Sequence, residues 1–225
     1  MARVLKRAGK ASLLSRVQIS ELFSRLRELN PKPVTELEYS TPFELLVAVT
    51  LSAQATDVGV NKATRRLFPV ANTPQAILDL GEDGLKRYIN TIGLYNAKAA
   101  NVVAACRILV EKHNSVVPQT REELEALPGV GRKTANVVLG NVFAIPGMVV
   151  DTHVKRLAGR FGWTRESDPV RIEKDLCQLL PEERWTQTSH VLILHGRALC
   201  KAPIPHCSLC PVLDLCPRQG ITRSH

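Results

Sequence analysis

The chain has 225 residues, of which 44% are hydrophobic and 23% charged, a composition too apolar for a disordered protein. No run of about 18 apolar residues occurs, which excludes a membrane-spanning helix. The first 20 residues also lack the apolar core of a secretory signal, so we expect an intracellular protein.

The net charge of +9 is concentrated in two segments. The first is a basic N-terminal arm, residues 1–14, which we expect to be flexible. The second lies between Ala126 and Arg165, where six bases accompany one acid, Asp151. These bases are Arg132, Lys133, Lys155, Arg156, Arg160 and Arg165. Such a segment indicates a surface that meets phosphates, although solvated helix faces produce basic runs as well.

Helix signals recur along the chain and strand signals do not. A first apolar helix is predicted to end at Asn30-Pro31. Further helix starts are predicted at Thr41-Pro42, Thr73-Pro74, Asn96, Thr120, Asp151-Thr152, Asp168-Pro169 and Ser189. No segment alternates apolar and polar residues up to a hairpin turn. The sequence therefore predicts an all-α fold of about ten short helices.

Four of the six cysteines lie within 17 residues, at the spacing C-x6-C-x2-C-x5-C: Cys200, Cys207, Cys210 and Cys216. Prolines interleave with them, which favours a loop wrapped around a metal centre over a helix. Thiolates suit zinc and iron–sulfur clusters alike, and a single C-x2-C pair favours a cluster. Cys106 and Cys177 stand alone in helical patterns and are predicted to be core thiols.

A second motif joins two predicted helices through Leu127-Pro128-Gly129-Val130-Gly131, followed by Arg132 and Lys133. The glycines let the backbone approach a partner closely, and the first N–H groups of the second helix have no intrahelical partner. Together with the two bases they predict an anion site, for which DNA phosphate is the natural ligand. The alternative is a tight connection between packed helices.

Asp151 stands at a predicted helix start, where an N-cap is the plainest role for a carboxylate. Thr152 is an equally good cap, and capping by Thr152 leaves Asp151 free for other work.

These motifs, together with Leu51–Asp57 and Thr91–Asn96, closely resemble the endonuclease III family of DNA glycosylases. The resemblance covers nearly the whole chain from Ser15 to Cys216. It implies a two-domain helix-hairpin-helix fold, with a six-helix barrel domain at 35–145 and the hairpin at about 120–142. A second helical domain, 15–34 with 146–225, is expected to carry a C-terminal [4Fe-4S] cluster loop at 200–216.

The resemblance also implies the chemistry. The target nucleotide leaves the duplex, and Lys133 attacks C1′, expels the base and forms a Schiff base. Asp151, on the other side of a DNA-binding cleft, stabilises the charge that develops on the sugar. The Schiff base allows β-elimination 3′ to the abasic site. We therefore expect a bifunctional glycosylase and AP lyase that removes oxidised pyrimidines from double-stranded DNA, with Cys200, Cys207, Cys210 and Cys216 holding the cluster.

Other positions are expected to bind DNA. Gln54 resembles a residue that fills the gap left by the flipped nucleotide, and Leu94 resembles one that wedges against the opposite strand. The remaining expected contacts are Gly129, Val130, Gly131, Arg132 and Lys201. The loop between the first two cluster cysteines carries only one fixed charge, Lys201, where the family usually has several.

Two alternatives remain open from the sequence: a glycosylase for another lesion or mismatch, and a non-catalytic DNA-binding redox sensor. We expect a monomer without membrane association, in a bacterial cytoplasm and at the nucleoid.

Overall fold

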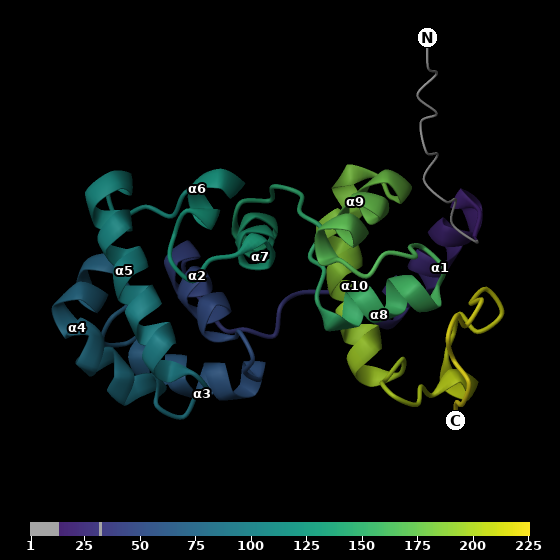
Figure 1. The fold of residues 1–225 in the computed structure, drawn as a ribbon, viewed down its shortest axis with the longest axis horizontal. Coiled ribbons are helices and arrows are strands. Elements are labelled where there is room, and N and C mark those ends of the chain that lie inside the picture. Colours follow the sequence, from purple (N-terminus) through teal and green to yellow (C-terminus); the bar gives the residue numbers. More distant parts are fainter. Residues whose placement is uncertain (1–13, 32) are drawn as a thin grey trace, which may run out of the picture. The chain divides into compact units, whose positions relative to one another are not determined.

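The computed structural model describes residues 14–31 and 33–225, so the predicted arm at 1–14 lies outside it except for Leu14. Within the described residues the fold consists of ten α-helices and two short 3-10 helices, without a β-strand (Figure 1). The all-α prediction is therefore confirmed. No helix in this part of the chain is long and apolar enough to cross a membrane.

Contacts divide the chain into two compact units. The hairpin unit is Thr35–Gly147, and the cysteine unit combines the described residues up to Val34 with Met148–His225. The predicted domain bounds, 35–145 and 15–34 with 146–225, stay a prediction.

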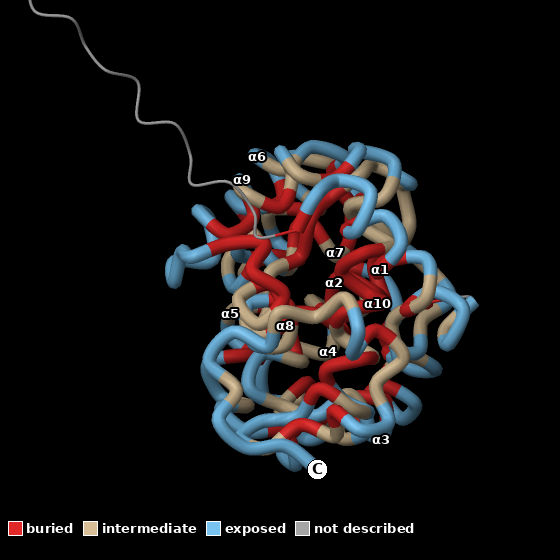
Figure 2. Tube along the Cα trace, turned by 90° about the vertical axis from the view of Figure 1, so that its right-hand side faces the viewer, coloured by how far each residue is buried: buried red, intermediate tan, exposed pale blue. Residues whose placement is uncertain are grey.

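The hairpin unit contains six helices. They are α2 (Pro42–Leu51), α3 (Asp57–Leu67), α4 (Pro74–Ile89), α5 (Tyr95–His113), α6 (Arg121–Glu125) and α7 (Arg132–Val142). Every residue of α2 from Phe43 to Leu51 is buried, as expected for a helix that is apolar on all sides (Figure 2). This helix forms the centre of the unit's hydrophobic core, against which α5 and α7 pack.

The cysteine unit has its own core. Its elements are α1 (Arg16–Leu29), α8 (Thr152–Arg160), α9 (Pro169–Leu179), η1 (Glu182–Arg184), α10 (Trp185–Ala198) and η2 (Cys207–Leu209). The buried face of α1, with Leu22 and Leu26, contributes to this core, and Val212 adds an apolar side chain from the cysteine loop. The first helix of the chain therefore belongs with the C-terminal elements.

Side-chain caps account for most helix starts. Thr41, Thr73, Thr120 and Asp168 each accept a hydrogen bond from a backbone N–H one turn later. Gly81 interrupts α4 with φ 70° and ψ 170°, and the helix resumes after it.

Two predicted starts are wrong. α5 begins at Tyr95 because Leu94 turns the chain in the left-handed conformation, so Asn96 lies inside the first turn and caps nothing. α10 begins at Trp185, four residues before Ser189, because η1 leads directly into it. In both cases the helix starts through backbone geometry, without a side-chain cap. Propensity patterns do not reveal such a start.

Candidate active site and metal centre

The predicted hairpin connects α6 to α7. The Val130 N–H donates to the Leu127 carbonyl oxygen at 3.0 Å, which closes the turn. The Val130 side chain is buried and lines a small cavity with residues of α2 and α5, including Val102 and Cys106. Val130 therefore anchors the hairpin in the core and is not exposed for side-chain contact with a ligand.

The two glycines of the hairpin have different environments. Gly129 has φ +79°, and a Cβ at this position would lie 2.9 Å from the Cβ of Asn101, so only glycine fits. A Cβ on Gly131 would meet nothing within 4 Å. Gly131 is the N-cap of α7 and offers no side-chain acceptor to the first N–H groups of the helix. No side chain of this cap residue pairs with these donors, and the space beside the Gly131 Cα is open.

Lys133 is the second residue of α7 and is exposed. The first turn of α7 contains no acid, so the partial positive charge of the helix start adds to the charge of the lysine. This arrangement combines an accessible amine with an adjacent anion-binding backbone.

Gln54 and Leu94 are the next predicted site residues in the hairpin unit. Both have positive φ, 54° and 60° respectively, and both are exposed, Leu94 to 61%. A Cβ on Gly93 would lie 3.9 Å from the Gln54 carbonyl oxygen, which places the two turns side by side. Left-handed backbone is uncommon for these residue types and is typical of functional turns. Without the resemblance, apolar Leu94 is a core candidate, and its exposure excludes that role.

In the cysteine unit, Asp151 is the N-cap of α8. Its Oδ1 accepts a hydrogen bond from the Val154 N–H at 2.8 Å. The alternative in which Thr152 caps the helix is therefore wrong: the helix begins at Thr152, and the carboxylate one residue earlier reaches the N–H of Val154. Capping through Oδ1 leaves Oδ2 to interact with another group.

His153 follows Asp151 and lies partly buried. Burial lowers the pKa of His153, and the Asp151 charge opposes that effect. The Nδ1 atom of His153 lies 3.0 Å from Nη2 of Arg156, so a neutral imidazole accepts a hydrogen bond there. This histidine is part of a structural network.

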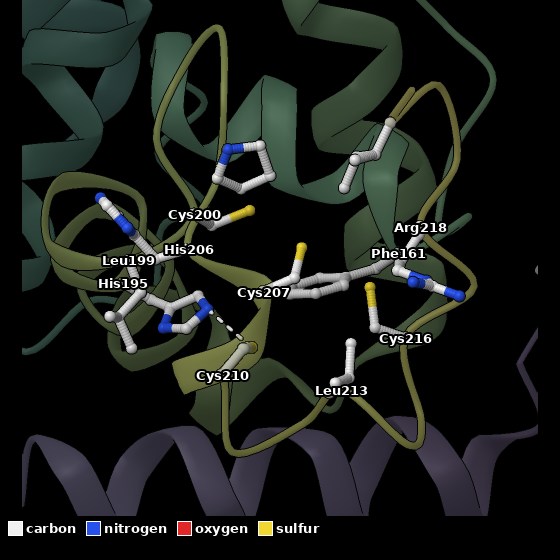
Figure 3. Close-up of a pocket in the computed structure, with 12 residues that line it drawn as sticks. Phe161, His195, Leu199, Cys200, His206, Cys207, Cys210, Leu213, Cys216 and Arg218 are labelled. Carbon is white, nitrogen blue, oxygen red and sulfur yellow. Dashed lines mark hydrogen bonds between the residues drawn. The ribbon is translucent and has the colours of Figure 1, made fainter. Parts of the chain in front are cut away.

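The four clustered cysteines line one cavity, open in part to solvent (Figure 3). The segment that carries them has a single 3-10 turn, η2, as the interleaved prolines predict. No three His, Cys, Asp or Glu side chains among the described residues are arranged to hold one metal ion. The four cysteines thus line one shared volume.

Side-chain nitrogens approach two of these thiols. Nη1 of Arg160 donates to Sγ of Cys200 at 3.2 Å, and Nε2 of His195 lies 3.6 Å from Sγ of Cys210. Burial raises the pKa of Cys210, and it raises that of Cys216 to about 11. At neutral pH these thiols need a bound cation to become thiolates.

Arginines tie α8 to the cysteine loop. Nε of Arg156 and Nη1 of Arg160 each donate to the Cys200 carbonyl oxygen at 3.1 Å, and Arg160 also donates to the Lys201 carbonyl oxygen at 2.9 Å. The helix that starts at Asp151 is thereby attached to the first cysteine. The exposed side chain of Lys201 has no role in this attachment.

These contacts correct the interpretation of the second basic segment. Arg156 and Arg160 bind the cysteine loop, and Nζ of Lys155 donates to the Ser167 carbonyl oxygen at 2.6 Å. Lys155, Arg156 and Arg160 therefore have structural partners. Their i, i+4 spacing on α8 signals that Arg156 and Arg160 share a helix face, but a single sequence does not show what that face meets.

Comparisons with known proteins agree with this arrangement. Residues 47–182 match the HhH-GPD superfamily base excision DNA repair protein model. Endonuclease III of Haemophilus influenzae is 59% identical to the chain, and that of Escherichia coli strain K12 is 56% identical. Each alignment covers 87% of this chain and 93% of the relative.

Among solved structures, a trapped endonuclease III–DNA covalent intermediate superposes with a TM-score of 0.87 at 43% identity. It covers 92% of this chain and 97% of its own. A thermostable thymine-DNA glycosylase superposes with a TM-score of 0.79 at 22% identity, which shows a shared fold.

Proposed function

The chain belongs to the endonuclease III family of HhH-GPD base excision DNA repair proteins, and we propose that it excises oxidised pyrimidines with Lys133 as the nucleophile. The enzyme is accordingly a DNA glycosylase with AP lyase activity. The observation that supports Lys133 is its position: an exposed residue in the first turn of α7, directly after a hairpin with open space beside Gly131. We propose that it acts as a monomer on double-stranded DNA at the bacterial nucleoid.

Excision proceeds on a nucleotide rotated out of the duplex. The unprotonated Nζ of Lys133 forms a bond to C1′ while the bond from C1′ to the base breaks. The base leaves with the electron pair and takes up a proton. Opening of the sugar ring then gives a C1′=Nζ Schiff base, the covalent intermediate of nucleophilic catalysis by lysine.

Strand cleavage follows from the same intermediate. Loss of a proton from C2′ and departure of the 3′ phosphate break the C3′–O bond. Water hydrolyses the Schiff base and returns Lys133 to its amine form. Asp151, through the oxygen that does not cap α8, stabilises the positive charge on the sugar and accepts protons during these steps.

The hairpin backbone holds the DNA during this chemistry. The Gly131 N–H and the first N–H groups of α7 bind a phosphate of the damaged strand, assisted by Arg132. Gln54 enters the gap left by the flipped nucleotide and Leu94 wedges against the opposite strand, which their exposure and left-handed backbone support.

The cysteine loop fits a [4Fe-4S] cluster better than a single zinc ion. In a cluster each iron takes one thiolate, so the four sulfurs surround a volume, whereas zinc draws four ligands to one point. Cys200, Cys207, Cys210 and Cys216 line such a volume and would hold the cluster. The bound cluster would act as a cross-link for a loop with little regular secondary structure.

Borohydride trapping tests the nucleophile. The wild type, Lys133→Ala and Lys112→Ala are incubated with a duplex containing thymine glycol, and Lys112 serves as the control because it is exposed on α5. We expect a covalent protein–DNA band with the wild type and the control, and none with Lys133→Ala. Absence of a band with a folded, DNA-binding wild type would contradict the proposal.

A panel of duplexes tests the substrate. Thymine glycol, a uracil–guanine mismatch and 8-oxoguanine are offered separately to the wild type under single-turnover conditions. Preferential release of thymine glycol supports the oxidised-pyrimidine assignment. Release of another base, together with a covalent Lys133–DNA adduct, would support the mechanism. It would assign that other lesion as the substrate.

A further inference from the structure

Lys98, on α5, is a buried lysine that the reaction described above does not use. Its side chain is only 5% exposed, and its Nζ has no hydrogen-bond partner among the described residues. Burial lowers the pKa of Lys98. A buried amine without an acceptor opposes folding, so the free protein gains no stability from it.

The position of Lys98 connects it to the two exposed turns. It is the fourth residue of α5, and its backbone N–H donates to the Leu94 carbonyl oxygen at 3.1 Å. Helical side chains lean toward the N-terminus of their helix, so the Lys98 stem runs back toward the turn formed by Gly93 and Leu94. Gly93 in turn lies against the Gln54 carbonyl oxygen.

The turn that carries Gln54 follows the C-terminal end of α2, where the Ser52 carbonyl oxygen accepts from the Ala55 N–H at 3.0 Å. Carbonyl oxygens at a helix C-terminus carry partial negative charge and attract an ammonium group. Gln54 and Leu94 both hold left-handed backbone, a conformation that non-glycine residues leave readily when contacts change. Lys98, whose amine has no acceptor, thus lies one helical turn after Leu94, and the Gly93–Leu94 turn lies next to the Gln54 turn.

We propose that Lys98 is a positioning residue for base excision: when Gln54 and Leu94 enter the duplex, the Gln54 turn presents a backbone oxygen to the Lys98 amine, which then holds Gln54 in the gap. This inference rests on the proposed function. Lys98 touches neither DNA nor the reacting atoms and acts through Gln54. The Lys98 amine has no hydrogen-bond acceptor in the free protein and gains one in the DNA-bound conformation.

Three substitutions separate this role from a structural one. Lys98→Met keeps the length of the side chain and removes the donor, Lys98→Arg keeps a donor, and Lys112→Met makes the same change at an exposed position of the same helix. The measurements are thermal unfolding, affinity for undamaged duplex, and the single-turnover rate of thymine glycol release.

Lys98→Met is expected to unfold at the wild-type temperature or above it and to bind undamaged duplex normally, while its excision rate falls at least tenfold. Lys98→Arg recovers part of that rate, and Lys112→Met matches the wild type. An unchanged rate for Lys98→Met would overturn the inference. Loss of folding would overturn it too, because the amine would then be required by the free protein.

A double-mutant cycle with Gln54→Ala tests the route through Gln54. If Lys98 acts by holding Gln54, Lys98→Met causes no further loss in the Gln54→Ala background. If the fold-losses in excision rate of the two single variants multiply in the double variant, the two residues act independently. That result would contradict the inference. A wild type that releases no base refutes the proposed function, whereas an active wild type with an unaffected Lys98→Met refutes only the role of Lys98.

Discussion

At the residue scale, Gly129 and Gly131 meet different requirements within one turn. Gly129 is needed by the fold, since its positive φ and the nearby Asn101 leave no room for a Cβ. Gly131 has free space around the position of a Cβ, so the folded chain alone does not require glycine there. Close approach of a ligand to the backbone explains this second glycine.

Alanine at each position separates the two requirements. Gly129→Ala is expected to cost about 2 kcal/mol or more of stability, because left-handed backbone and a clash both oppose it. Gly131→Ala should unfold like the wild type but lose roughly tenfold in DNA affinity, about the value of one charged hydrogen bond. Denaturant unfolding and a binding titration measure these effects. Equal DNA affinity of the wild type and Gly131→Ala would show that DNA does not approach the backbone at Gly131.

Asp151 combines a cap with a proposed catalytic role, and amide substitution distinguishes them. Asparagine caps helices as well as aspartate does, so Asp151→Asn should retain wild-type stability while base excision falls at least a hundredfold. Asp151→Ala should lose about 1 kcal/mol of stability in addition. Unfolding curves and single-turnover rates give the comparison. Full activity of Asp151→Asn would show that the carboxylate caps the helix and has no catalytic role.

At the element scale, the C-terminal segment packs against the cysteine loop. The Gln219 N–H donates to the Arg160 carbonyl oxygen at 3.0 Å, and the His225 N–H donates to the Pro205 carbonyl oxygen at 2.9 Å. Between them Ile221 lines the cysteine cavity. This segment thus covers part of the cavity with an apolar side chain.

Ile221→Ala should therefore expose the proposed cluster to solvent. We expect iron to be released to a chelator several times faster than from the wild type, followed through the visible absorbance, because removing apolar cover admits solvent. Val170→Ala, at an exposed position on α9, is the matched control and should release iron at the wild-type rate. Identical rates for all three proteins would show that Ile221 does not protect the cavity.

At the scale of the whole molecule, the two units have separate hydrophobic cores. The cysteine unit contains two buried histidines on α10. Burial lowers the pKa of His190 and lowers that of His195 to about 4. Unfolded histidine titrates near pH 6.5, so below that pH the unfolded chain binds more protons than the folded one.

The stabilising contribution of neutral His190 is consequently complete above about pH 6.5 and is lost as the pH falls toward its lowered pKa. Hydrogen exchange at pH 7 and pH 5 should show protection factors that decrease in α10 more than in α2. His190→Gln should reduce this difference, and His113→Gln in the hairpin unit should not. Equal loss of protection in both units would contradict separate stability of the units.

Local patterns determined much of the molecule because their causes are local. The apolar spacing predicts helices, Thr41 and Thr73 supply caps, and the cysteine spacing predicts a loop around a metal centre. Where helices start through backbone geometry alone, as at Leu94, no local signal exists. The resemblance to the endonuclease III family identified the chemistry, which composition and periodicity do not contain.

Tertiary structure decided what each charged or polar group meets. The sequence places Arg156 and Arg160 in a basic segment, but only the fold shows that they bind the Cys200 carbonyl oxygen. Likewise a helical lysine is expected at the surface, and only packing buries Lys98. The reason is physical: helix formation depends on neighbours within a turn, whereas burial and pairing depend on residues brought together from distant parts of the chain.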